Sequence, residues 1–258
     1  NHMAFTVETP WLRDVLRRGA DSPYARHFDT DPDAARLRLP WLGAPFDTLA
    51  EEGAFAVEDD EDGPVLVTGG LRVPLADKPE LEAARSPATP GAIRALHDAQ
   101  PWRLVHWRTE RDALTHRRFF NITSLIGIRV EDETVFDDMH ALLFGLIEAG
   151  TVDGVRIDHI DGLADPAAYL DRLAARIPGV PIWVEKILTG PERLPADWPV
   201  EGTTGYVAAR ALGRLLTDGD GLTRIHTAYQ EATGRTDPME EVLIRAKRQI
   251  MTQDLAAE

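Results

Sequence analysis

Two carboxylates stand at the ends of short apolar runs in the second half of the sequence. Asp158 ends the run VRID, and Glu185 ends the run PIWVE. Side chains alternate between two faces along a β-strand, so Val155 and Ile157 share one face. Arg156 and Asp158 then share the other. Parallel α/β proteins keep their reactive side chains at the carboxyl ends of strands, so both acids are candidates for catalysis.

The spacing of the two acids limits the chemistry they could share. They stand 27 positions apart, which fits one strand–helix–strand step and neighbouring strands about 4.8 Å apart. Carboxyl groups about 5–5.5 Å apart suit retaining glycoside chemistry, whereas a wider gap suits inversion. Arg156 can hold Asp158 ionised, and Lys186 adds a cation beside Glu185. The alternative interpretation is a structural ion pair on one strand and an ordinary glutamate at the end of the next.

The elements around these acids alternate between helix and strand. The run TVFDDMHALLFGLIEAG predicts an amphipathic helix that stops at Gly150. A strand, the helix DPAAYLDRLAARI, a second strand and helices near 222–233 and 237–257 follow. This order is typical of βαβ units in a parallel sheet. The residues predicted on one face of the first helix are Val135, Met139, Leu142, Leu143 and Leu146.

The first half of the sequence predicts a smaller mixed α+β subdomain. A helix is expected over Thr9 to Gly19, with the threonine as its N-cap. RLRLPWLG and RLVHWR resemble strands, and a hairpin is expected around the acidic turn Asp59 to Gly63. The stretch KPELEAARSPATPG is interpreted as a proline-rich loop or linker.

Composition narrows the class of protein. The 258-residue chain carries 43 acidic and 28 basic side chains, a formal charge of −15, which disfavours nucleic acid and anionic membrane partners. It has no cysteine and no apolar run long enough to span a bilayer. We therefore expect a soluble, cytoplasmic protein. No sequence pattern requires a cofactor or a metal ion, although the presence of a structural calcium ion is left open.

Longer phrases resemble one enzyme family. They are THRRFFNITSLIGIRVEDETVFDDMHALLFGLIEAGTVDGVRIDHIDGLADPAAYLDRLA and VEKILTGPERLPADWPVEGTTGY, together with TPWLRDVL, QPWRLVHWR and KRQIMTQDLAAE. The chain resembles the maltooligosyltrehalose synthases, members of the α-amylase superfamily, over most of its length. Matches of this length are far more specific than a lone Arg–x–Asp.

The resemblance implies a partial (β/α)8 barrel with an inserted mixed α+β subdomain. Residues 1–3 would be the end of the third barrel strand, 4–132 the inserted subdomain, and 133–258 the barrel portion up to about the sixth strand. The opening NHMAFTVETPWLRDVL resembles the junction after the third strand in this family. An expression-tag scar is the alternative explanation of Asn-His-Met. On the resemblance we expect a central fragment of a longer enzyme, inactive alone.

The resemblance also implies a role for individual residues. Asp158 would be the nucleophile and Glu185 the general acid and then the base. Arg156 would be the partner of the nucleophile, with the remaining substrate-binding positions at His2, His159, Lys186 and Tyr206. Four aromatic side chains of the inserted subdomain are candidates to line the substrate pocket, although such residues more often belong to the hydrophobic core. They are Trp102, Trp107, Phe119 and Phe120.

The implied reaction is an intramolecular transfer of glucose on a soluble maltooligosaccharide. The α-1,4 bond at the reducing end would become an α,α-1,1 bond through retention in two steps. A third carboxylate that the superfamily uses is not found after Glu185. The sequence departs from the family phrases at Asn121, Thr123, Ser124, His116, Ile160 and Val207. These departures put the preference for transfer over glucose release in doubt.

Two alternatives remain after the sequence has been considered. One is an α-glucan hydrolase or another transglycosylase that uses the same two acids. The other is a non-catalytic glucan-binding descendant of the family. Product analysis would separate the first from a synthase, because only a synthase leaves a terminal trehalose unit.

Overall fold

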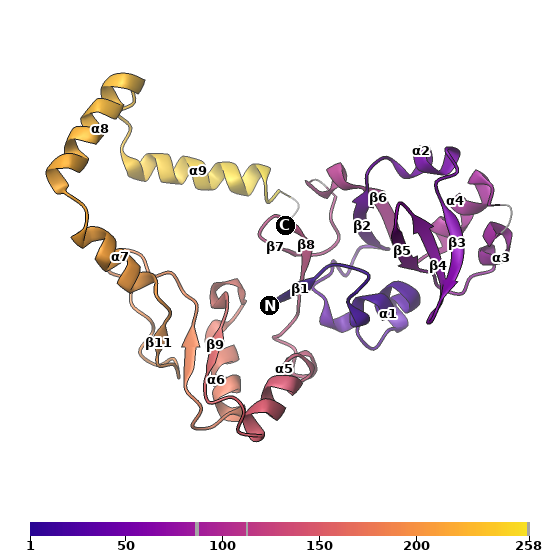
Figure 1. The fold of residues 1–258 in the computed structure, drawn as a ribbon, viewed down its shortest axis with the longest axis horizontal. Coiled ribbons are helices and arrows are strands. Elements are labelled where there is room, and N and C mark those ends of the chain that lie inside the picture. Colours follow the sequence, from indigo (N-terminus) through magenta and orange to yellow (C-terminus); the bar gives the residue numbers. More distant parts are fainter. Residues whose placement is uncertain (86–87, 112, 257–258) are drawn as a thin grey trace. The chain divides into compact units, whose positions relative to one another are not determined.

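The computed structural model describes residues 1–85, 88–111 and 113–256. The chain divides into two compact units. One holds Asn1 and Val130–Ala246, and is called the acid-pair unit because it contains both candidate acids. The other holds His2–Arg129 and Lys247–Glu258, and is called the N-terminal unit. Each unit is described by itself (Figure 1).

Short sheets organise the N-terminal unit. Strand β2 (Leu37–Leu42) pairs in parallel with β6 (Trp102–His106). An antiparallel meander is formed by β3 (Ala56–Asp60), β4 (Gly63–Thr68) and β5 (Leu71–Pro74). A third sheet has the order β1-β8-β7, with bounds His2–Ala4, Ile122–Gly127 and Arg118–Phe119. Sheets and helices therefore mix in this unit.

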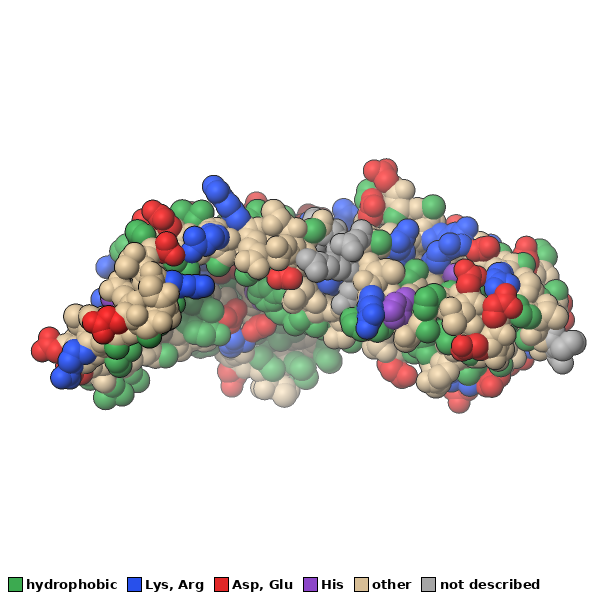
Figure 2. Space-filling model, turned by 90° about the horizontal axis from the view of Figure 1, so that it is seen from above, with side chains coloured by type: hydrophobic (Ala, Val, Ile, Leu, Met, Phe, Trp, Pro, Cys, Tyr) green, Lys and Arg blue, Asp and Glu red, His purple; other side chains and the backbone are tan. Residues whose placement is uncertain are grey.

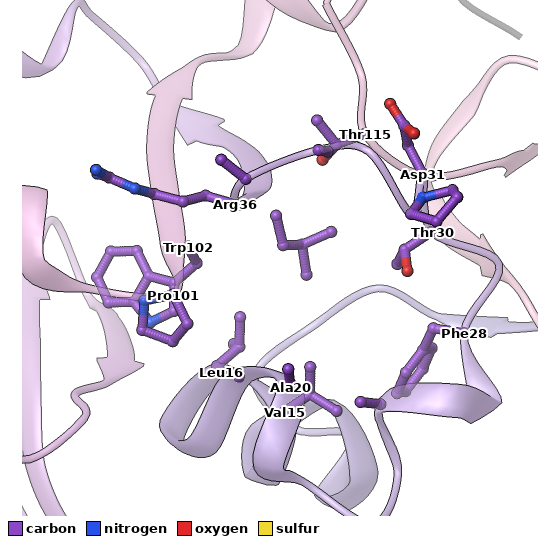
Figure 3. A pocket seen from close by; sticks show the side chains of 16 residues that line it. Val15, Leu16, Ala20, Phe28, Thr30, Asp31, Arg36, Pro101, Trp102 and Thr115 are labelled. Carbon is purple, nitrogen blue, oxygen red and sulfur yellow. The ribbon is translucent and has the colours of Figure 1, made fainter.

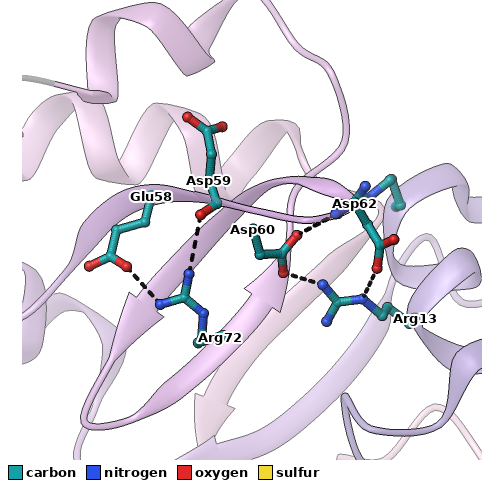
Figure 4. A network of polar contacts seen from close by, with 7 residues as sticks. Arg13, Glu58, Asp59, Asp60, Asp62 and Arg72 are labelled. Atoms are coloured by element: carbon teal, nitrogen blue, oxygen red, sulfur yellow. Dashed lines mark hydrogen bonds and ion pairs between the residues drawn. The ribbon is translucent and has the colours of Figure 1, made fainter.

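The predicted hairpin is confirmed. Asp60 pairs with Gly63 where β3 turns into β4. Arg13 reaches this turn from helix α1 (Pro10–Arg18) and binds both Asp60 and Asp62, with 2.8 Å between its Nε and Asp62 Oδ2 (Figure 4). On the meander itself, Arg72 Nη1 donates to Glu58 at 2.6 Å. The acidic turn is thus tied to the rest of the unit by arginines.

Helix α1 (Pro10–Arg18) confirms the first predicted helix, but the role given to its cap residue was wrong. Thr9 occupies the N-cap position without accepting an amide hydrogen bond from the helix. Its hydroxyl instead donates to the carbonyl of Ala4 at 2.7 Å, and so anchors the preceding strand. At the other end Gly19 has φ of 62°, a backbone conformation that favours glycine.

The interpretation of KPELEAARSPATPG as a loop was wrong in part, because helices occupy both of its ends. Helix α3 covers Glu80–Arg85, and α4 covers Pro90–Ala99. Thr89 caps α4 by accepting the amide hydrogen of Ala92 at 3.2 Å. Pro90 fits because the first turn of a helix needs no internal amide donor. Residues 86 and 87 of the stretch lie outside the described residues.

The core of the N-terminal unit lies between the sheets and these helices. Trp102 is fully buried, and its indole Nε1 donates to the carbonyl of Pro74 at 3.0 Å. Leu39 and Leu104, partners in register on β2 and β6, are buried beside it. Helix α2 (Phe46–Glu51) stacks Phe46 on the His97 ring of α4, with ring centroids 3.8 Å apart.

The acid-pair unit contains a three-stranded parallel sheet in the order β11-β10-β9, with bounds Gly202–Thr203, Ile182–Val184 and Val155–Ile157. Helix α5 (Glu133–Glu148) precedes β9, and α6 (Pro166–Arg176) connects β9 to β10. This confirms the predicted βαβ unit. Three further α-helices follow in the described residues: α7 (Tyr206–Leu215), α8 (Gly219–Thr233) and α9 (Met239–Gln253), the last of which passes into the N-terminal unit at Lys247. Helices α8 and α9 confirm the two predicted C-terminal helices.

The predicted apolar face of α5 was wrong in part. Val135 is buried as expected, but Leu142 is 76% exposed, and Phe136, which was not predicted on this face, is fully buried. Phe136 packs against Tyr169 of α6 with ring centroids 5.5 Å apart. The helix is apolar on more than one side, so periodicity alone did not identify the side that packs on α6.

The charged surface mixes both signs, with red and blue side chains interspersed on the face in Figure 2. Within the described residues, no helix combines the length and the apolar composition needed to cross a membrane. The same residues contain no group of three or more His, Cys, Asp or Glu side chains that could hold a metal ion.

Candidate active site

The ends of β9 and β10 position the two candidate acids. The strands run parallel, with Arg156 in register with Trp183 and Ile157 with Val184. Beyond β10 the amide of Glu185 donates to the carbonyl of Ile157 at 2.7 Å, so the ladder extends to the acid itself. Asp158 and Glu185 therefore follow adjacent strands at the same edge of the sheet, which confirms the predicted strand arrangement.

Arg156 orients Asp158. Its Nη1 donates to Asp158 Oδ1 at 2.7 Å, and its Nε donates to the hydroxyl of Thr204 at 3.1 Å. The two contacts fix both ends of the guanidinium. The ion pair is open to solvent, since the arginine side chain is 46% exposed and that of the aspartate 61%. Thr204 was missed in the sequence; the only signal was its place in GTTGY.

Glu185 is held by a backbone contact. Its Oε2 accepts the backbone N–H of His159 at 3.2 Å. Interaction with the Glu185 carboxylate raises the pKa of Tyr206 above its usual value. The negative charge of Asp158 raises the pKa of Tyr206 further, while the charge of Arg156 lowers it. Both acids, the arginine and the tyrosine therefore lie within electrostatic reach of one another.

His159 joins the two strand ends in a strained turn. Its φ of 48° is left-handed, which is uncommon for a residue with a side chain and is found at functional sites. The side chain of Asn1 donates to the His159 carbonyl at 3.2 Å. Gly162, in the turn that follows, lies so close to the His159 ring that a methyl group there would overlap it. Glycine at 162 thus leaves room for the imidazole.

Lys186 connects two loops of the site. Its Nζ donates to Asp161 Oδ1 at 2.8 Å and lies 3.3 Å from Glu192 Oε1. The hydrogen bond to Asp161 raises the pKa of the ammonium, and the side chain is only 16% exposed. Lys186 therefore holds the loop after β9 against the loop after β10. Its two carboxylate partners were not found in the sequence, since neither spacing is a recognisable pattern.

His2 lies in the other unit, so the structure does not join it to the acids in one compact body. It belongs to β1, which pairs antiparallel with β8, and its ring centroid is 4.1 Å from that of Phe119. Trp102, proposed as a pocket wall, is fully buried core, whereas Trp107 and Phe120 are 49% and 59% exposed.

A cavity of about 260 Å³ lies in the N-terminal unit (Figure 3). Apolar side chains such as Leu16, Phe28 and Trp102 line it, with Asp31 and Arg36 at one side. It contains neither candidate acid. The chemistry of the acid pair therefore belongs to the open edge of the parallel sheet and not to this cavity.

The arrangement at the sheet edge suits acid–base and nucleophilic work on a neutral polyol. One carboxylate, Asp158, is oriented by the guanidinium of Arg156. The other, Glu185, accepts the backbone N–H of His159, so it can exchange a proton while remaining oriented. Trp183, 37% exposed and on the same face as Arg156, offers an apolar surface of the kind sugar rings contact. It was missed as a site residue, although its alternation with Glu185 is readable in the sequence.

Comparison with known proteins identifies relatives of this chain. No family model matches it. A curated protein of Mycobacterium tuberculosis, provisionally named maltooligosyl trehalose synthase, is 40% identical over 230 residues, which are 88% of this chain and 28% of that protein. The solved maltooligosyltrehalose synthase from Arthrobacter ramosus is 40% identical, with a TM-score of 0.85 over 100% of this chain and 32% of its own.

A second solved structure, the DSM5389 glycosyltrehalose synthase, has a TM-score of 0.87 and 32% identity, over 99% of this chain and 35% of its own. The mixed α/β fold of this chain is thus that of a part of these enzymes. The chain spans about a third of the length of the relatives that it matches.

Proposed function

We propose that this chain, a homologue of the maltooligosyl trehalose synthases over about a third of their length, supplies the catalytic acid pair of such an enzyme. The reaction is the conversion of the reducing-end α-1,4 bond of a maltooligosaccharide into an α,α-1,1 bond. The observation that carries the proposal is the placement of Asp158, with its arginine, beside Glu185 at the ends of adjacent parallel strands.

The proposed architecture is part of a (β/α)8 barrel. Residues 133–258 supply barrel strands and helices, 4–132 form an inserted subdomain, and 1–3 end a further barrel strand. Support comes from the parallel order of β9, β10 and β11 and from the helix that connects the first two. Strands β9, β10 and β11, together with the strand that ends at residue 3, are fewer than the eight of a closed barrel of this type.

In the first step Asp158 attacks C1 of the glucosyl unit next to the reducing end. Glu185 protonates O4 of the terminal glucose, the C1–O4 bond breaks, and a glucosyl ester of Asp158 forms. In the second step the freed glucose turns, and its anomeric hydroxyl attacks C1 of the ester while Glu185 takes its proton. Asp158 leaves as a carboxylate, and two inversions at C1 give net retention.

The neighbouring groups support these steps. Arg156 stabilises the negative charge that returns to Asp158 when the ester breaks. The amide of His159 holds Glu185 in position for both proton transfers. We assign the His159 ring and the Tyr206 hydroxyl to sugar hydroxyls as well. Lys186 acts through the loops that it connects, and His2 is assigned to the substrate only on family resemblance.

The proposed partner is a soluble maltooligosaccharide and the proposed compartment is the cytoplasm. No nucleic acid or membrane partner is included, because the charge of −15 would repel both. The chemistry as written needs only carboxylates and hydroxyl groups, so no cofactor is proposed.

Maltohexaose turnover by the native polypeptide that carries this chain tests the proposal. Glu185→Gln should lower the rate of loss of reducing ends by about 1000-fold while sugar binding persists, because a general acid is removed and no binding group is lost. Asp158→Asn should do the same. The matched control is Asp153→Asn, which removes an exposed acid outside the pair and should leave the rate unchanged.

Three results would contradict the proposal. Unchanged turnover in Asp158→Asn would exclude the nucleophile. A wild-type protein that binds maltohexaose without altering it would favour a non-catalytic glucan-binding protein. Release of glucose in place of a trehalose-ended product would identify an α-glucan hydrolase with the same acids, an outcome consistent with the departures near Asn121 and Ile160.

A further inference from the structure

The outer face of the β2–β6 sheet carries a group of arginines. On β2, Leu39 points into the core, so its neighbour Arg38 points outward. On β6, the same holds for Leu104 and Arg103. Arg38 and Arg103 are partners in register, so their side chains stand next to each other on one face.

This pairing is electrostatically unfavourable as it stands. Like charges directly opposite each other destabilise a sheet. Arg103 is ion-paired with Asp98, and Arg36, two residues before Arg38, lies 3.9 Å from the same carboxylate. Within the described residues, no carboxylate lies within ion-pair distance of the Arg38 guanidinium. The exposed Asp98 is therefore the ion-pair partner of two of the three arginines.

A cavity of about 600 Å³ opens over this face. Arg36, Arg38 and Arg103 line it together with Asp31 and Thr115, so its charged lining has three positive groups and one negative. This balance is the opposite of the chain as a whole, whose net charge is −15. The volume is that of a site for a small molecule.

Two further contacts indicate what the cavity can hold. The Nη1 atom of Arg36 is buried and donates no hydrogen bond in the part of the chain that the structure describes, because its ion-pair partner Asp98 Oδ1 lies 3.9 Å away, beyond hydrogen-bond distance. Thr115 accepts the backbone N–H of Arg38 through its hydroxyl oxygen at 2.8 Å, which leaves the hydroxyl hydrogen to donate. The cavity therefore presents guanidinium and hydroxyl donors to an acceptor with several oxygens.

We propose that this arginine cavity binds a phosphoryl group, carried by inorganic phosphate or by a small phosphate monoester. Arg38 and Arg103 contact the phosphoryl oxygens from adjacent strands, and the planar guanidinium suits two-point contacts to them. Asp31 accepts hydrogen bonds from the hydroxyl groups of a monoester. The bound anion neutralises the cross-strand repulsion, so binding stabilises the N-terminal unit. The site is independent of the acid pair, which lies in the other unit.

Isothermal titration of the full chain with inorganic phosphate, glucose 6-phosphate and glucose, at low and constant ionic strength, tests the proposal. We expect saturable binding of at least one phosphate compound and none of glucose. Arg38→Gln should weaken that binding about tenfold or more. Arg38→Lys should weaken it less, because a lysine keeps the positive charge and lacks only the planar guanidinium that makes two-point contacts. The matched control Arg248→Gln removes an exposed arginine of α9 and should bind as wild type.

Thermal unfolding separates a phosphate-binding role of Arg38 from a purely structural one. Arg38→Gln removes the repulsion with Arg103, so it should raise the melting temperature without phosphate and abolish the increase that phosphate produces in wild type. Tighter binding of glucose 6-phosphate than of phosphate would identify a monoester as the ligand, and equal binding would identify the free anion. The proposal is overturned if neither compound binds, if glucose binds as well as its phosphate, or if Arg248→Gln weakens binding as much as Arg38→Gln.

Discussion

His97 should make the N-terminal unit sensitive to mild acid. The ring is 4% exposed, and its Nε2 accepts the backbone N–H of Leu104 at 3.0 Å. An acceptor nitrogen carries no proton, so the folded state requires the neutral ring. Burial, together with the charge of Arg103, lowers the pKa of His97 from 6.5 to about 4.

The size of the effect follows from the two pKa values. Above pH 6.5 the ring is neutral in both states, and the stabilisation is complete. Below that value His97 binds a proton in the unfolded chain but stays neutral in the folded chain. The free energy of unfolding therefore falls with pH until the pH passes the folded pKa of about 4. Between pH 7 and pH 5 this linkage removes about 2 kcal/mol of the free energy of unfolding. His116, also buried and with its pKa lowered to about 4, adds a loss in the same direction.

Urea unfolding followed by tryptophan fluorescence at pH 7, 6 and 5 measures the loss, and proton NMR of the imidazole ring measures the pKa directly. In His97→Gln the side-chain carbonyl can still accept the Leu104 amide, so about half of the pH dependence should disappear. The matched control His226→Gln removes an exposed histidine and should leave the profile unchanged. A His97 pKa near 6.5 in the folded chain, or a stability that is constant from pH 7 to pH 5, would refute the reasoning.

Three further outcomes are expected. Gly162→Ala should push the ring of His159 and lower maltohexaose turnover of the native polypeptide without unfolding it, whereas unchanged kcat and KM would show that the ring position is irrelevant. Asp132→Ala should cost about 1 kcal/mol of the free energy of unfolding in a urea titration, because its carboxylate caps α5 by accepting two backbone N–H groups, and no loss would disprove the cap. Arg156→Gln should lower kcat about tenfold or more with little change in KM, because it removes a charge-assisted hydrogen bond to Asp158; a change in KM alone would place the arginine on the substrate and not on the acid.

The strand ends of the acid pair could be predicted because the signals are local. Alternation around Arg156 and Asp158 depends on two or three residues, and the 27-residue interval to Glu185 is set by one helix and its loops. Their hydrogen bond at 2.7 Å joins neighbours on one strand face, so no knowledge of the remaining fold was needed. The hairpin at Asp59 to Gly63 was readable for the same reason.

Features that depend on distant partners could not be predicted. The α5 helix is apolar on more than one side, and only the position of Tyr169 on α6 determines that Phe136 is buried and Leu142 is not. The register that places Arg38 beside Arg103 joins strands that are far apart in the sequence. The Thr9 hydroxyl can either cap α1 by accepting a backbone N–H or donate to a carbonyl group. In the structure it donates to the carbonyl of Ala4.

The identity of the covalently modified carboxylate tests the central claim most directly. The native polypeptide would be incubated with 5-fluoro-α-D-glucosyl fluoride, whose ring fluorine slows breakdown of a glucosyl ester, and its peptides analysed by mass spectrometry. The proposed mechanism predicts one fluoroglucosyl adduct, on the peptide that contains Asp158, and none in Asp158→Asn. An adduct on Glu185 or on any other carboxylate would contradict it.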